Sequence, residues 1–107
     1  MYSLVFHTIN PADWYARTQS FQILNIIAEL TRAGSWIVKN EPQMVNDCYA
    51  RALELIDLTR SDPRWQTALH ELSRAREYLA YLYHQLEKDK HQNDLLIQGL
   101  AGLIKSV

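Results

Sequence analysis

Residues 63–88, PRWQTALHELSRAREYLAYLYHQLEK, repeat their apolar side chains every three or four positions. This spacing is typical of an amphipathic α-helix, because residues three or four apart lie on the same side of it. One arc of such a helix carries Trp65, Ala68, Leu69, Leu72, Ala75, Leu79, Leu82, Tyr83 and Leu86. We therefore expect a single helix over 63–88 with this arc facing a core.

The same periodicity predicts three further helices, at about 11–33, 42–60 and 94–106. The first begins with a strong signal, because Asn10 can accept a hydrogen bond from the helix start and Pro11 has no N–H to leave unpaired. Four amphipathic helices with short connections predict an all-α fold, an up-and-down four-helix bundle. At 107 residues the chain is long enough for one such domain, residues 1–107, and too short for two.

The connections are predicted from the loss of this pattern. Gly34 is the expected stop of the first helix, and residues 34–41 are expected to be irregular. In the last connection, Asn93 or Asp94 is the expected cap of the final helix. The N-terminal residues 1–9 alternate weakly and favour a short extended segment, which either packs over the bundle or pairs with the same segment of another subunit.

Composition excludes several classes of function. Eleven basic and twelve acidic residues give a net charge of -1, so nucleic acid is not favoured as a partner. No apolar run approaches the roughly 20 residues that span a bilayer, and the N-terminus lacks the pattern of a signal peptide. The single cysteine, Cys48, lies on an apolar helical face and is expected to be a buried thiol. We therefore expect a cytoplasmic protein with no membrane partner.

Motifs for metals and cofactors are absent from the sequence. No glutamate has a histidine three residues on, which excludes the Glu-x-x-His pattern of di-metal bundles. His84, Glu87 and His91 would share one side of a continuing helix, but a solvated helix face is the preferred interpretation. Neither a phosphate-binding glycine loop nor a Cys-x-x-Cys pair occurs. We expect no metal and no cofactor.

One pair of residues suggests a catalytic alternative. Arg64 and His70, in RWQTALH, have the spacing Arg-x5-His at the start of a helix in a small all-helical domain. The pair resembles the Arg-x4-6-His motif of the HEPN superfamily, whose helical bundles often dimerise. The resemblance implies a ribonuclease in which His70 acts as acid or base and Arg64 steadies the phosphate.

The tyrosines of 63–88 indicate an interaction surface. Tyr83 belongs to the core arc, whereas Arg74, Tyr78, Tyr81 and Gln85 form a second stripe on the same helix. Arginine and tyrosine are enriched at the centres of protein interfaces because they bury a large area and keep a polar group.

The helix predicted at 11–33 is also apolar around most of its circumference, more than a monomer buries. We therefore expect a non-enzymatic protein that works as a homo-oligomer, with another protein as a possible partner.

Overall fold

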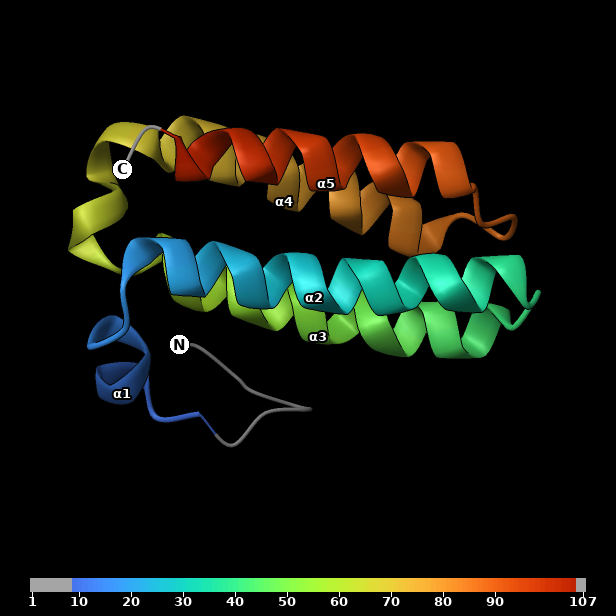
Figure 1. Ribbon diagram of the computed structural model, residues 1–107, viewed down its shortest axis with the longest axis horizontal. Helices are drawn as coiled ribbons and strands as arrows, with labels where there is room; N and C mark the ends of the chain where they lie inside the picture. Colours follow the sequence, from blue (N-terminus) through green and yellow to red (C-terminus); the bar gives the residue numbers. More distant parts are fainter. Residues whose placement is uncertain (1–8, 106–107) are drawn as a thin grey trace.

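The computed structural model describes residues 9–105, and within them the chain is helical with no strand (Figure 1). The elements are α1 (Pro11–Tyr15), α2 (Gln19–Val38), α3 (Pro42–Arg60), the 3-10 helix η1 (Pro63–Ala68), α4 (Leu69–His84) and α5 (Lys90–Ile104). The four long helices form two layers, α2 with α3 and α4 with α5. Each of them packs against the two next to it, so that the ring closes from α5 back to α2. The predicted all-α bundle is confirmed, and the predicted extended segment lies almost wholly outside the described residues.

The helix predicted at 11–33 is two helices. Asn10 caps α1 as expected, since its Oδ1 accepts a hydrogen bond of 2.8 Å from the backbone N–H of Ala12. A second cap then interrupts the chain: Thr18 Oγ1 accepts from the backbone N–H of Phe21 at 3.1 Å and begins α2. The short α1 turns away from α2 because buried Trp14 reaches α3.

Gly34 does not end α2, which continues to Val38. Gly34 is buried where α2 meets α5, and a Cβ there would lie 3.3 Å from Asn93 Nδ2. The glycine therefore serves close helix packing. The left-handed residue after the helix is Asn40, with φ of 57°. The expected irregular segment shrinks accordingly to the residues between α2 and α3.

The helix predicted at 63–88 begins as expected but ends early, at His84. The first turns are η1, and the backbone of Gln85 is extended, with ψ of 133°. Lys88 stabilises this end, because its Nζ donates to the carbonyls of Leu82, Tyr83 and Gln85 at 3.0, 3.0 and 2.6 Å. Burial lowers the pKa of Lys88.

The final helix starts earlier than predicted, at Lys90, with Asp89 as its cap. Asp89 Oδ1 accepts from the backbone N–H of Gln92 at 3.2 Å. Asn93 is fully buried inside α5, so its prediction as a cap was wrong. α3, by contrast, has the bounds predicted for it, Pro42–Arg60.

The core contains most of the predicted apolar arc. Trp65, Leu72, Leu79 and Leu82 are buried, as is Cys48 on α3. Leu86 is the exception: it is 95% exposed, because the helix that would have turned it inward has already ended. None of the helices in the described part of the chain combines the length and apolar character needed to cross a membrane.

Candidate functional site: a groove between α4 and α5

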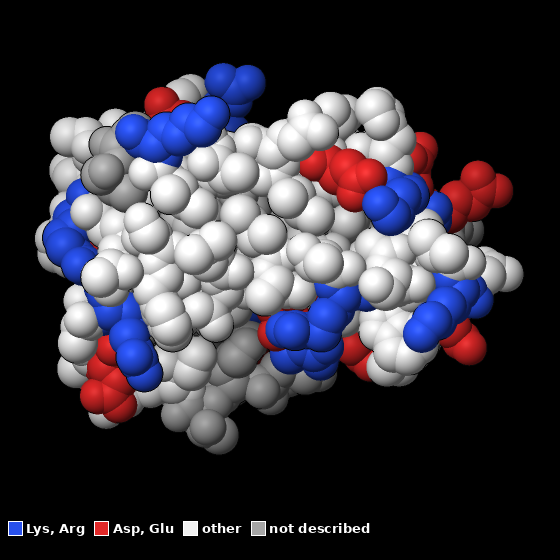
Figure 2. All heavy atoms as spheres, viewed as in Figure 1, with Lys and Arg blue, Asp and Glu red and all other residues white. Residues whose placement is uncertain are grey.

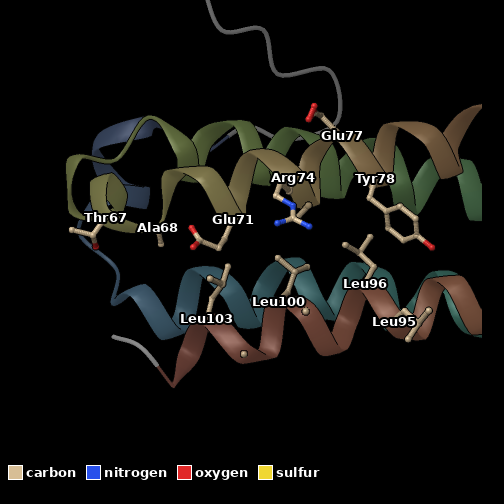
Figure 3. Close-up of a pocket in the computed structure, with 13 residues that line it drawn as sticks. Thr67, Ala68, Glu71, Arg74, Glu77, Tyr78, Leu95, Leu96, Leu100 and Leu103 are labelled. Carbon is tan, nitrogen blue, oxygen red and sulfur yellow. The ribbon is translucent and has the colours of Figure 1, made fainter.

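A groove of about 1010 Å³ opens between α4 and α5 (Figure 3). It lies where α5 faces η1 and the first three turns of α4. Its lining consists of Thr67, Ala68, Glu71, Arg74, Ala75, Glu77, Tyr78, Leu95, Leu96, Gly99, Leu100, Gly102 and Leu103. A groove of this size is open and elongated enough to receive part of another protein.

The two sides of the groove differ in polarity. Leu96 and Leu100 of α5 are buried and point toward α4, which gives the groove an apolar floor. On the outer side of α5, Gly99 and Gly102 are exposed, and a Cβ at either position would meet no described atom within 4 Å. The α5 side of the groove therefore contributes no charged side chain. The polar groups of the groove come from α4 and η1.

The charges along this face of α4 have no partner within the described chain. Glu71 and Arg74 project into the groove, whereas Glu77 points away from α5 (Figure 3). None of these three side chains forms an ion pair among residues 9–105. Arg76, two residues further along α4, is by contrast paired within the chain, because its Nε lies 2.8 Å from Asp57 Oδ1 on α3. The guanidinium of Arg74 is thus available to a ligand or a partner.

The structure brings three of the four predicted stripe residues together. Arg74 and Tyr78 line the groove, and the ring of Tyr78 stacks on that of Tyr81, with centroids 6.3 Å apart. Tyr78 is half-buried against the core, and Tyr81 is 50% exposed. Gln85 lies beyond the end of α4 and borders, with Tyr81, a separate hollow next to the α4–α5 connection. The stripe is therefore shorter by one turn than the sequence predicts.

Arg64 is held by contacts within the chain. Its Nη2 lies 2.7 Å from Asp62 Oδ2 and also donates to the carbonyls of Tyr15 and Arg17 at 2.9 and 2.7 Å. These bonds fasten the link between α1 and α2 to η1. His70 is exposed on the first turn of α4, and neither a hydrogen bond nor an ion pair between described residues joins it to Arg64. Ribonuclease activity of this pair stays a prediction.

The histidines do not assemble a metal site in the described residues. Because α4 ends at His84, the helical spacing that would have aligned His84, Glu87 and His91 is lost. No group of three or more His, Cys, Asp or Glu side chains between residues 9 and 105 could hold a metal ion.

Two buried polar clusters went unnoticed in the sequence. In the first, Asn93 Oδ1 accepts from Tyr49 Oη at 2.8 Å, and Asn93 Nδ2 donates to the carbonyl of Leu30 at 3.0 Å. Burial raises the pKa of Tyr49 well above its ordinary value. These bonds join α2, α3 and α5 beneath the outer surface, so the cluster is structural.

The second cluster lies where η1 meets α2. Gln22 Nε2 donates to Asp62 Oδ2 at 2.9 Å, and Gln22 Oε1 accepts from Trp65 Nε1 at 2.6 Å. Burial alone would raise the pKa of Asp62, but hydrogen bonds from Arg64 and Gln22 outweigh it and hold the pKa below its usual value. The polar side chains of this cluster are thus engaged with one another.

The face formed by α2 and α5 carries few charges. Figure 2, viewed from that side, shows a broad uncharged area with Lys, Arg, Asp and Glu mainly toward its margins. Leu24 of α2 is 54% exposed, and Leu95 of α5 is 45% exposed. The apolar circumference predicted for the first long helix is therefore only partly covered within one chain.

No protein-family model, curated protein or solved structure matches this chain.

Proposed function

We propose that the protein is not an enzyme and acts by associating with other protein chains through the side of α4 that borders the groove. The observation that carries this proposal is the combination at Arg74 and Tyr78: an unpaired guanidinium and an aromatic ring beside an apolar floor. Once a partner covers them, centres built from arginine and aromatic side chains and surrounded by polar residues hold most of the binding energy in protein interfaces.

A further feature supports association over small-molecule catalysis. The described side chains around the groove offer no nucleophile paired with a base, and the carboxylate of Glu71 is the one acidic group that points into it. The groove is also open along its length, whereas pockets for small ligands bury most of the ligand surface. Self-association is the simplest form of the proposal, in a cytoplasmic setting that suits the lone Cys48.

The test is to truncate the exposed aromatic residue and the core residue of the same helix in parallel. Wild-type protein should show a mass above the 12.5 kDa of one chain by light scattering at micromolar concentration. Tyr81→Ala, alone or with Tyr78→Ala, should weaken association by one to two orders of magnitude, since an interface tyrosine contributes about 1–3 kcal/mol.

Leu79→Ala is the matched control, because Leu79 is fully buried on the other side of α4. It should lower the free energy of unfolding by about 2–5 kcal/mol through the cavity it leaves. Thermal midpoints and masses are measured for every variant at several concentrations, because loss of a partner itself lowers apparent stability. Assembly of the Tyr78→Ala, Tyr81→Ala double variant at wild-type strength would contradict the proposal.

A further inference from the structure

We infer that the partner of this face is a second copy of the chain, arranged about a two-fold axis with the two α4 helices antiparallel and in contact; this rests on the association proposed above. In such an assembly Glu71 of each subunit meets Arg74 of the other.

The position of the charges leads to this arrangement. A two-fold interface uses the same surface on both subunits, so every contact between two different residues occurs twice. When α4 packs antiparallel on a second α4 with the axis midway between positions 71 and 74, each Glu71 faces an Arg74. One axis therefore forms the same opposite-charge pair twice.

The alternative two-fold arrangement, with α4 of one subunit over α5 of the other, is not complementary in charge. Residues 95–104 of α5, LLIQGLAGLI, contain no charged side chain. Arg74 and Glu71 would then be desolvated against an uncharged helix, which costs free energy. Gly99 and Gly102 line the groove from α5 and are exposed, so these two positions add no side chain that would obstruct contact between two α4 helices.

Glu77 provides an internal control for charge. It is also an unpaired carboxylate on α4 within two turns of Glu71, but its side chain points away from α5 and is not on the line that joins Glu71 and Arg74 (Figure 3). Because its side chain points away from α5, reversal of its charge should weaken association less than reversal at Glu71. A general effect of net charge on assembly would instead appear equally in Glu71 and Glu77 variants.

The experiment uses charge reversal in the full chain. Glu71→Arg and Arg74→Glu, each alone, place like charges opposite each other twice and should weaken self-association at least about tenfold. Mixing the two variants in equal amounts should restore assembly, because the mixed dimer again contains two opposite-charge pairs. The combined Glu71→Arg, Arg74→Glu variant should also assemble, since its surface is self-complementary with the signs exchanged.

Sedimentation velocity over a concentration series gives the association constants, and thermal midpoints of the dilute proteins check that each variant is folded. Restoration in the mixture, together with loss in each single variant, supports the antiparallel pair. Weakened single variants without restoration overturn the two-fold pairing but leave α4 as an association surface. Single variants that assemble like wild type overturn the contact on α4 itself, and wild-type protein with the mass of one chain at all concentrations overturns the second copy as partner.

Discussion

The hydrogen bond between Tyr49 and Asn93 offers a test of how the helices are held together. Asn93 is fully buried, and its carboxamide accepts from Tyr49 Oη at 2.8 Å and donates to the carbonyl of Leu30 at 3.0 Å. Asn93→Ala removes both bonds and leaves the hydroxyl of Tyr49, a residue that is 1% exposed, without its acceptor. An unsatisfied buried hydroxyl costs about 1–3 kcal/mol, and the cavity left by the carboxamide adds to it. We expect Asn93→Ala to lower the free energy of unfolding by about 2–4 kcal/mol.

Tyr49→Phe separates the hydrogen bond from the cavity. This variant removes the hydroxyl and keeps the ring, so it should cost about 1–2 kcal/mol. In the double variant the hydroxyl is already gone, and Asn93→Ala should then cost less than it does alone. The difference, a coupling of about 1–2 kcal/mol, is read from urea unfolding of the four proteins at one fixed protein concentration. Effects of the two substitutions that simply add would refute the bond as a stabilising contact.

Two further predictions concern the reactivity of the Cys48 thiol and the loss of stability at acidic pH. Burial raises the pKa of the Cys48 thiol, so a thiol reagent should label native protein slowly until denaturant is added; rapid stoichiometric labelling would place Cys48 at the surface. Asp62 has a lowered pKa in the folded protein, so its contribution to stability is present above its unfolded value of about 3.9 and is lost as pH falls through the folded value. The Asp62→Asn variant should therefore be less stable than wild type at pH 7, and its thermal midpoint should fall less steeply below about pH 4. A variant whose thermal midpoint falls as steeply as that of wild type at acidic pH would argue against this linkage.

The helices that were predicted well are those whose signals are local. α3 begins at a proline and keeps one apolar face through Leu55 and Ile56, so the proline and the periodicity together predict its two ends. At the first helix the apolar pattern runs on without a break, and a capping threonine in the middle of it gives a weak signal. Thr18 becomes a cap because burial of Trp14 against α3 draws the preceding turn aside, and that contact spans 45 residues of sequence to Thr59.

The connection between α4 and α5 was predicted poorly for a related reason. Leu86 continues the apolar arc in sequence, yet the chain turns before it because the amine of Lys88 satisfies the carbonyls at the end of α4. Asn93 has the composition of a cap, but its partner is Tyr49, 44 residues earlier in the chain. Neither hydrophobic periodicity nor helix-capping rules can predict such tertiary contacts, because both consider only residues that are close together in the sequence.

The candidate site shows what the sequence could and could not distinguish. Arg74 and Arg76 both fall outside the core arc, and the sequence assigns only Arg74 to the stripe with Tyr78 and Tyr81. In the structure the guanidinium of Arg76 contacts Asp57 of α3, whereas Arg74 faces the α5 side, where residues 95–104 offer no charge to meet it. The helix that packs on each face of α4 therefore decides which arginine is satisfied within the chain. Since a charge of this kind at the edge of an apolar groove gains most from a carboxylate outside the chain, the proposed contact is better supported at Arg74 than at any other arginine of α4.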